Sequence, residues 1–462
     1  MFAGALWAPQ TLNAPAQAAP SDRPTLHDPS PVPPLAASTP PLPETLPAPA
    51  GAPQPGEGPL SLNQVIEGCL LNDPVLRAGI EAVRQASANA VTASLAPNPV
   101  LVTDQILNPL GQAFTPTQQG GPPQFDLGFQ YPVDWFLFGK RAAAMQSAGA
   151  GVRVSEADYA DLVRLRVLQA AEAYYTVLEA KGLVALAQQD VDNLRQIEAV
   201  TLRAVEGGGR PQVELNRVRL DRLRSEQTLR NSEYTRIAAL ASLRALLGQA
   251  DGQSVMDVAG TLDFAVQPSV VTADEAFTVA GENRPDVSAR RWAVDEARRM
   301  VVLETRRAYP EITPMVGYTR QFQHQFIGYP DANSWGVGFN ASLPLLDRNQ
   351  GNRMRAASVV IQREQELQAR LVAVRAEVEQ AVFGLRTAVA NSQAVAGEQL
   401  TLARDVREAL NRAYEAGGRP LIDVLDAQRN YRDTYRLYIS SRADYGRAVV
   451  RLDAVLGKRF AP

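Results

Sequence analysis

Apolar positions recur at alternating steps of three and four residues over very long stretches of this chain, a spacing typical of an α-helix that packs along a partner helix. The longest stretch runs from about Arg353 to Tyr414. Its heptad seam consists of Leu371, Val374, Val378, Ala381, Leu385, Ala388, Val395, Leu402, Val406, Ala409 and Ala413, with Ser392 and Gln399 in the two gaps. A second stretch with this spacing returns from Val424 to Leu456. The pattern predicts an antiparallel coiled-coil hairpin whose first helix is about 90 Å long.

The same hairpin pattern occurs earlier in the chain. A helix from about Ala142 to Val205 begins its seam with Ala160, Val163, Val167, Ala170, Tyr174 and Val177. In each half the helical pattern stops at a short turn and then resumes. The two turns have the sequences Gly208-Gly209-Arg210-Pro211 and Gly417-Gly418-Arg419-Pro420, and a carboxylate, Glu214 or Asp423, lies four residues after each arginine. Because glycine and proline interrupt helices, these turns are predicted to be the tips of two helical hairpins.

Other segments also occur twice, in the same order. Asn72-Asp73-Pro74-Val75 corresponds to Asn283-Arg284-Pro285-Asp286, and Ala245-Leu246-Leu247-Gly248 corresponds to Ala454-Val455-Leu456-Gly457. Pro132, followed by Gly139, corresponds to Pro344, followed by Gly351. A repeat of about 200 residues is too long for a solenoid unit. We therefore predict one duplicated domain with two-fold pseudo-symmetry.

Strict alternation of apolar and polar residues marks two segments as β-strands with one apolar and one polar face. These segments run from Phe125 to Val133 and from Trp335 to Leu343. Each follows a weaker strand pattern, near residues 100–107 and 312–319, across a loop rich in glycine, proline and glutamine. The sequence thus predicts four strands, two in each half.

Four strands cannot close a barrel on their own, since the smallest barrels have about eight. Three copies of the chain would supply twelve strands and could close one. The alternative is an amphipathic sheet that caps a soluble coiled coil. The aromatic residues near the strand ends fit both a girdle at a membrane interface and a sheet core. They are Tyr131, Trp135, Tyr318 and Trp335.

These patterns divide the chain into four predicted segments: a proline-rich disordered tether (1–60), a first repeat (61–248), a connection (249–271) and a second repeat (272–458). The tether holds 16 of the 33 prolines, which favours an extended chain without a core. Ala16-Gln17-Ala18 has the spacing of a signal-peptidase site, but no basic residue precedes Arg23. A truncated signal peptide and a plain linker both stay open.

Composition excludes several function classes. A net charge of -3 from 46 basic and 49 acidic residues gives no basic surface for nucleic acid. One cysteine, Cys69, expected to be buried in a helix, and two histidines, His27 and His324, leave little for a disulfide framework or a metal site. We find no nucleophile with a base and no phosphate loop, so neither an enzyme nor a cofactor is expected. No apolar run approaches the ~20 residues of a spanning helix, so a membrane could be crossed only by strands.

The second turn and its surroundings resemble the TolC-like outer membrane efflux proteins. The similarity is carried by the run Tyr414-Glu415-Ala416-Gly417-Gly418-Arg419-Pro420-Leu421-Ile422-Asp423-Val424-Leu425-Asp426-Ala427-Gln428. It also includes Asn98-Pro99 before the first strand and the duplication itself, and it covers roughly residues 60–458. Pro211 and Pro420 depart from the family pattern in both turns.

This resemblance implies a mainly α-helical fold with a small β part. The duplicated coiled-coil hairpins would form an α-barrel in the periplasm, and four strands per chain would join a trimeric 12-stranded β-barrel surrounded by outer membrane lipid. The implied function is a passive exit duct of a tripartite efflux pump, a homotrimer recruited by a periplasmic adaptor protein and an inner-membrane pump. Phe138-Gly139-Lys140-Arg141 resembles the heavy-metal branches, yet metal ions and organic cargo both stay open. The alternative function is a coiled-coil scaffold without a pore.

The resemblance also implies a gate at the channel entrance. Asp423 and Asp426 match aspartates that ring the entrance, Tyr414 and Arg419 match residues that hold it shut, and Glu214 matches an acidic partner in the first repeat, where Asp is commoner. Simpler interpretations stay open, because Asp423 would also offset a helix dipole and Arg210 and Arg419 would also cap the preceding helices. We expect most of the gate to lie in the second repeat.

Overall fold

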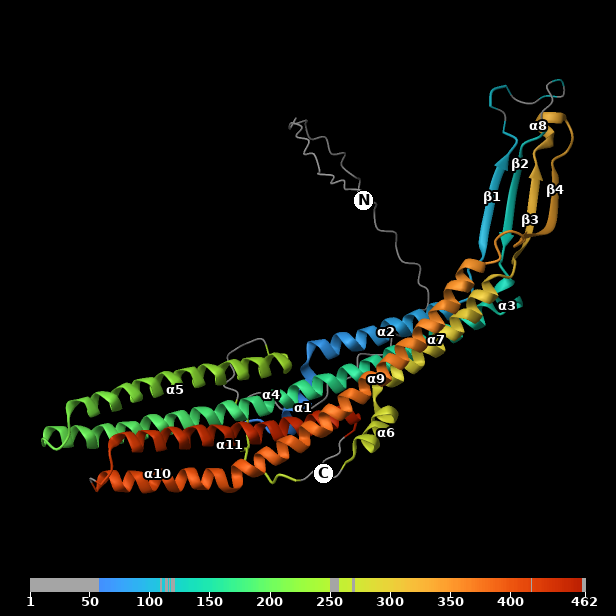
Figure 1. Cartoon of the computed structure of the whole chain (residues 1–462). Helices are drawn as coiled ribbons and strands as arrows, with labels where there is room; N and C mark the ends of the chain where they lie inside the picture. Colours follow the sequence, from blue (N-terminus) through green and yellow to red (C-terminus); the bar gives the residue numbers. More distant parts are fainter. Residues whose placement is uncertain are drawn as a thin grey trace, which may run out of the picture. The chain divides into compact units, whose positions relative to one another are not determined.

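Two long helical hairpins dominate the computed structural model, as the heptad pattern predicts (Figure 1). In the first, α4 (Lys140–Glu206) returns as α5 (Gln212–Leu246). In the second, α9 (Gln350–Ala394) continues through the π-helical turn η1 (Val395–Gln399) into α10 (Leu400–Glu415) and returns as α11 (Leu421–Leu456). The structure describes residues 58–108, 110–112, 115, 117, 121–249, 257–267, 271–416 and 418–458.

The four long helices of the tip half lie in one layer. α4 packs on α5 and on α11, and α11 packs on α10, so the order across the layer is α5, α4, α11, α10 (Figure 1). Each hairpin therefore contributes one inner helix, α4 or α11, and one edge helix, α5 or α10. The edge helices each have one side without a partner helix in the described part of the chain.

The π-helical turn corrects part of the predicted seam. Up to Val395 the prediction is right, since Val374, Val378, Ala381, Leu385 and Ala388 are buried. Beyond it, the predicted Leu402 and Val406 are about half exposed, at 54% and 51%. The residues that instead turn inward are Leu400, Ala403, Arg407, Leu410 and Tyr414. A π-helical turn inserts one residue into the helix, so the buried face moves by one position along the sequence.

The four predicted strands form a single antiparallel sheet. Its strands are β1 (Val100–Ile106), β2 (Gln124–Gln130), β3 (Glu311–Gln321) and β4 (Ala332–Ser342), in the order β1-β2-β3-β4. Tyr318 lies opposite Trp335 across the β3–β4 pair. β2 ends before Tyr131 and Val133, which were predicted inside it, although their N–H groups still donate to Pro314 and Ile312 of β3. Among the described strands, β1 and β4 form the two edges of the sheet.

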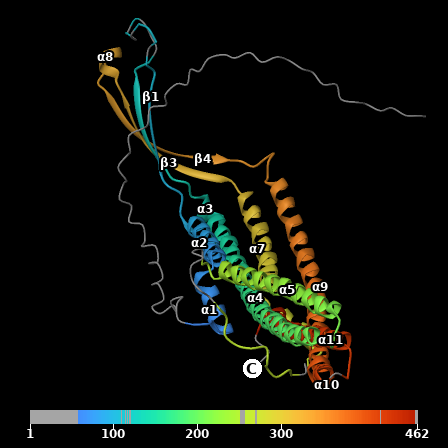
Figure 2. The ribbon, with the colours of Figure 1, turned by 90° about the vertical axis from the view of Figure 1, so that its left-hand side faces the viewer.

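Each repeat also contains a pair of short helices. The first repeat has α1 (Leu62–Asn72) and α2 (Pro74–Ser94), and the second has α6 (Ala273–Asn283) and α7 (Pro285–Arg307). α1 and α2 pack on α4, whereas α6 packs on α9 and α11, and α7 lies between α4 and α9 (Figure 2). Two one-turn helices complete the described elements, α3 (Asp134–Leu137) and α8 (Gln323–Ile327).

The end of each hairpin closes onto the junction of its short helix pair. Gly248 and Gly457 both have a positive φ, and each lies against the carbonyl of an equivalent asparagine, Asn72 or Asn283. A Cβ atom on Gly457 would come within 2.8 Å of that carbonyl oxygen. Both positions therefore require glycine for its backbone conformation and for the close approach.

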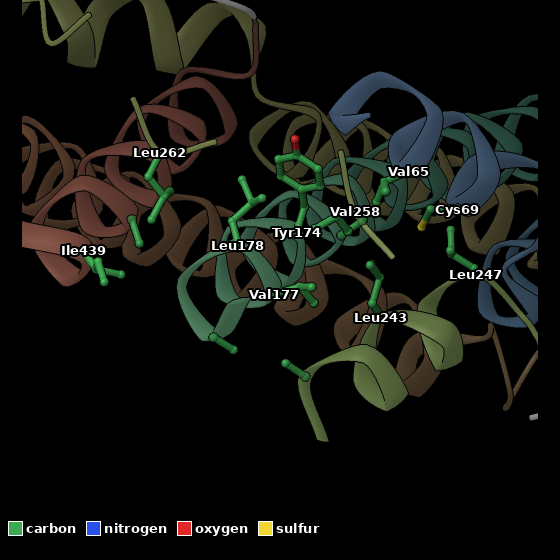
Figure 3. Packing of buried hydrophobic residues seen from close by; sticks show 14 of the residues in the cluster. Val65, Cys69, Tyr174, Val177, Leu178, Leu243, Leu247, Val258, Leu262 and Ile439 are labelled. Carbon is green, nitrogen blue, oxygen red and sulfur yellow. The ribbon is translucent and has the colours of Figure 1, made fainter. Parts of the chain in front are cut away.

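A hydrophobic cluster joins the first repeat to α11 and to the connection between the repeats (Figure 3). Val65 and Cys69 of α1 pack with Val177 of α4 and Leu243 of α5. The Tyr174 hydroxyl donates a hydrogen bond to the Ala259 carbonyl of the connection. Cys69 is the buried thiol that the sequence predicted, and burial, followed by the nearby Asp73 charge, raises its pKa to about 11. This thiol stays protonated at neutral pH.

Part of the predicted organisation lies outside the described residues. This applies to residues 1–57 of the tether, to 250–256 and 268–270 of the connection, and to Gly417 of the second tip. The boundaries of the four segments remain a prediction. Among the described helices, none combines the length and apolar character needed to span a lipid bilayer.

Candidate functional site at the hairpin tips

The two tips share backbone features at the residues that the structure describes, since Gly209 and Gly418 donate equivalent hydrogen bonds to Ala204 and Ala413. α4 ends at Glu206, Gly208 takes a positive φ of 72°, and Pro211 precedes the first turn of α5 with an extended conformation. In the second tip, Pro420 precedes α11 in the same way. Glu214 and Asp423 then lie in the first turns of α5 and α11, where a carboxylate offsets the helix dipole.

Tyr414 is buried between the two hairpins, with 5% of its surface exposed. Its ring packs in a cluster with Leu194, Val218, Leu421, Val424 and Leu425, which come from α4, α5 and α11. Its hydroxyl lies 3.0 Å from the Thr201 hydroxyl of α4. Tyr414 therefore connects the last turn of α10 to the helix of the other repeat.

Arg210 of the first tip reaches the same tyrosine. The guanidinium carbon lies 4.1 Å from the centre of the Tyr414 ring, and one guanidinium nitrogen lies 3.0 Å from a Glu214 carboxylate oxygen. A guanidinium over an aromatic face is attracted by the ring quadrupole. One continuous chain of contacts thus runs from the first tip to α10 and back to α4. It passes through Glu214, Arg210, Tyr414 and Thr201 in that order.

The matching residues of the second tip are held more loosely. Arg419 lies 3.6 Å from Asp423, and 60% of the Arg419 side chain is exposed, against 18% for Arg210. The structure thus brings Tyr414, Arg210 and Glu214 together, whereas Arg419 and Asp423 form an ion pair with each other.

Asp426, one turn further along α11, lies 3.2 Å from Arg429. The same arginine reaches Asp221 of α5 at 2.7 Å. Asp423 and Asp426 therefore each have an arginine partner, and Arg429 ties α11 to the first hairpin. An open cavity of about 700 Å³ separates the two tips, and it is lined by Gly207, Gly209, Arg210, Pro211, Glu214, Gly418, Arg419, Pro420 and Ala204.

Sequence reasoning missed the polar residues at buried seam positions. Asp190 of α4 is buried and accepts hydrogen bonds from Ser225 of α5 and Gln428 of α11. Ala187, Asp190, Leu194, Ile197 and Thr201 continue the steps of three and four along α4. A polar residue at such a step was the available signal for both Asp190 and Thr201. Within the described residues, no group of three or more His, Cys, Asp or Glu side chains is arranged to hold a metal ion.

A comparison with protein families identifies the architecture. The model of the outer membrane efflux protein family matches residues 65–249 and again residues 278–458, one match for each repeat and most of the chain in total. The chain belongs to the outer membrane efflux protein family.

Individual relatives agree with this membership. The outer membrane efflux protein described here is 26% identical over 409 residues to the cobalt-zinc-cadmium resistance protein CzcC of Cupriavidus metallidurans, covering 88% of this chain and 92% of the relative. It is 24% identical to the outer membrane protein TolC of Vibrio cholerae, with 84% and 88% covered. Its fold is similar to the CmeC outer membrane channel of Campylobacter jejuni, with a TM-score of 0.72 at 15% identity and 87% of each chain covered.

The predictions of fold class, function and location are therefore confirmed. This efflux protein is an outer membrane exit duct whose helices form a tunnel in the periplasm. The interpretation as a scaffold without a pore is set aside.

Proposed function

We propose that three copies of this chain form a passive duct in which the edge elements of neighbouring copies meet. β1 of one copy would pair with β4 of the next, because these are the two free edges of the sheet. Three sheets of four strands joined in this way close a barrel without an exposed edge, as a lipid environment requires. A head-to-tail contact of this kind generates a closed ring.

The helical layer supports the same arrangement. The side of α5 that faces away from α4 carries exposed apolar residues at heptad spacing. These residues are Val213, Leu220, Leu223, Tyr234 and Ile237. On α10, the other edge, Leu402 and Val406 are exposed. The seam that the sequence assigned to the hairpin itself is thus free to pack against the α5 edge of a neighbouring copy. Twelve helices would then form the tunnel wall.

We propose that the tips form the gate of this duct. Tyr414, Arg210, Glu214 and Thr201 hold the second hairpin against the first, and opening requires their contacts to break. Arg419 and Asp423 are exposed enough to reach a neighbouring copy. Three-fold symmetry would bring the Asp423 and Asp426 carboxylates of three copies to the entrance, where their charge attracts cations.

The proposed cargo and partners follow from a named relative and from the charges near the tips. The relative CzcC is named a cobalt-zinc-cadmium resistance protein, and the proposed ring of Asp423 and Asp426 carboxylates would attract divalent cations. We therefore favour metal cations over organic molecules as cargo. The two tips with their open cavity would meet a periplasmic adaptor protein, which links the duct to an inner-membrane pump, while outer membrane lipid surrounds the sheet.

The observation that carries the trimer is the pair of unpartnered edges, so the test acts on one of them. Val406→Asp places a charge on the exposed seam of α10 without touching the core of a single chain. Native mass spectrometry in detergent is expected to show a trimer for the wild type and monomers for the variant, with unchanged helix content by circular dichroism. Asp433→Asn, on the exposed side of α11, serves as the matched control. A monomeric wild type, or a trimer that tolerates Val406→Asp, contradicts the proposed assembly.

A further inference from the structure

The two short helix pairs dock on the long helices with the same backbone shape. Each junction places a proline at the start of its second helix, Pro74 or Pro285. Each is closed by a glycine at the end of a hairpin, Gly248 or Gly457, against the carbonyl of the residue that precedes the junction. We call the place where such a junction packs on a long helix a dock, so the first dock lies on α4 and the second on α9. The shape of the backbone alone does not distinguish the two docks.

The two docks differ in which side carries the acid and which carries the base. In the first repeat, the fully buried Asp73 accepts a hydrogen bond from Arg166 of α4. In the second, the fully buried Arg284 lies 2.7 Å from Glu377 of α9. The same sequence offset between the two repeats relates Asp73 to Arg284. It also relates Arg166 to Glu377. An acidic junction thus meets a basic helix in one repeat, and a basic junction meets an acidic helix in the other.

The second dock contains a further ion pair. Arg284 forms two hydrogen bonds with Asp286, and Arg370 of α9 bonds to both Asp286 and Glu377. The first dock is neutral with Asp73 and Arg166, and the second is neutral with its two arginines and two carboxylates. Exchanging the junctions would leave Arg166, Arg284 and Asp286 in one dock, and Arg370, Glu377 and Asp73 in the other. Each exchanged dock would bury one uncompensated charge, which is strongly unfavourable.

The short helices lie close enough to both kinds of long helix to pack on either one. α7 packs along α4 as well as α9, yet its junction pairs with α9. α2 leads into the edge strand β1, and β4 at the other edge leads into α9. When β1 of one chain pairs with β4 of the next, α2 lies between its own α4 and the α9 of the neighbouring chain. Two docks of the same shape then flank every junction.

We propose that the exchanged charges of Asp73–Arg166 and Arg284–Glu377 select the correct dock for each helix pair, and so keep α1 and α2 on their own chain during trimer assembly. The occupant of the α4 dock is a junction with a buried acid, and the occupant of the α9 dock is one with a buried base. This inference rests on the trimeric duct proposed above. In this proposal the buried ion pairs determine which long helix each junction binds, and they do more than add to the stability of the fold.

The test removes the charges at one dock and compares this change with a variant that keeps them. Asp73→Asn combined with Arg166→Gln makes the first dock and its junction neutral, so neither dock rejects the junction. Asp73→Glu combined with Arg166→Lys keeps the sign of both charges at the first dock and serves as the matched control. Both variants are made in a Cys69→Ala background so that only introduced cysteines react.

Two cysteine pairs report where α1 lies. Gly68→Cys with Leu247→Cys reports the native dock, since a Cβ atom at position 68 would lie 3.0 Å from the Leu247 side chain. Gly68→Cys with Leu456→Cys reports the α9 dock of a neighbouring chain, because Leu456 occupies the corresponding place at the end of α11. The first pair forms a disulfide within a chain, and the second would form a covalent dimer on a non-reducing gel.

With the wild-type charges, and in the Asp73→Glu, Arg166→Lys control, we expect only the disulfide within a chain. With the neutral pair, the covalent dimer should rise roughly ten-fold or more as discrimination is lost. A neutral pair that forms trimers with the native disulfide alone overturns the inference, and so does a neutral pair that fails to fold, since the ions would then act through stability. A wild-type chain that forms no trimer instead refutes the proposed duct, so the two failures are distinguishable.

Discussion

The guanidinium of Arg210 stacks on the ring of Tyr414 at 4.1 Å, so a residue of the first hairpin tip holds a residue of the second. Arg210 is kept in this position by Glu214, and both side chains are largely buried. The corresponding Arg419 has no aromatic partner among the described residues and is mostly exposed. The duplicated turn thus makes different contacts in the two repeats.

Replacing Arg210 should loosen the closed tip. Arg210→Ala removes the guanidinium stack on Tyr414, a contact of roughly 0.5–2 kcal/mol, and should raise the population of open channels by up to roughly thirty-fold. Single-channel recording in a planar lipid bilayer measures this population. Arg210→Lys keeps the charge but not the planar stack, and we expect it to fall between the wild type and Arg210→Ala.

Arg419→Ala is the matched comparison at the second tip. If Arg419 acts only through its exposed pair with Asp423, the open population should change less than in Arg210→Ala, because such pairs contribute roughly 0–1 kcal/mol. A larger effect at Arg419 would show that its main partner belongs to a neighbouring copy. An Arg210→Ala channel that gates like the wild type would remove Arg210 from the gate.

The bond between Tyr414 and Thr201 can be separated from the stack. Tyr414→Phe and Thr201→Val each remove one hydroxyl of this buried pair while preserving the packing. A double-mutant cycle on thermal stability should give a coupling of about 1 kcal/mol, the usual net value of a buried hydrogen bond. Additive effects of the two changes would mean that the hydroxyls do not act as a pair.

The acidic residues near the tips should set ion selectivity. Asp423→Asn combined with Asp426→Asn removes six carboxylates from a trimer at little structural cost, since both side chains are at least partly exposed. The reversal potential under a salt gradient should shift away from cation selectivity. Asp433→Asn lies on the same helix further from the tip and should leave the reversal potential unchanged. An unshifted potential in the double variant would exclude an aspartate ring at the constriction.

Acid should weaken the dock of the second repeat. Burial alone would raise the pKa of Asp286, but hydrogen bonds and charge from Arg284, then from Arg370, lower it from 3.8 to about 2. A carboxylate whose pKa is lower in the folded state stabilises the fold above its unfolded pKa, and this contribution is lost as the pH falls through the folded value. Its size at neutral pH is roughly 2 kcal/mol, and the loss should occur between about pH 4 and pH 2.

Denaturant titrations followed by circular dichroism at several pH values measure this loss. Asp286→Asn should be less stable at neutral pH and should depend less on pH below pH ~4. Asp274→Asn, which changes a strongly exposed carboxylate of α6, should keep the wild-type pH dependence. Equal acid sensitivity of the wild type and Asp286→Asn would contradict the assignment of the low pKa.

Periodicity predicted the long helices and the strands because both patterns extend over many residues. It placed α4 and all four strands to within a few residues, and the Gly-Arg-Pro turns correctly marked the tips. The seam beyond Val395 was wrong because an inserted π-helical residue moves the buried face by one position. Apolar residues stand at both alternative positions at Leu402 and Ala403, whereas the inward position after Val406 holds the charged Arg407. Local sequence does not decide between these two faces.

The tertiary contacts of the tip were beyond sequence reasoning for a different reason. Arg210 and Arg419 stand in nearly the same local sequence, yet only one lies beneath an aromatic ring. That difference depends on where Tyr414 is placed by the packing of Leu194, Val218 and Val424. The exchanged charges at Asp73 and Arg284 were visible in the aligned repeats, but their partners, Arg166 and Glu377, lie far along the chain and required the folded structure.

The central claim, a trimeric duct closed at its tips, is tested most directly by single-channel recording of the purified protein in a planar lipid bilayer. We predict discrete conductance steps for the wild-type trimer, with a low conductance that rises when Arg210→Ala and Tyr414→Ala are combined, because both contacts between the hairpins are then lost. A folded trimer that inserts into the bilayer and conducts no ions, in the wild type and in this double variant alike, would contradict the account.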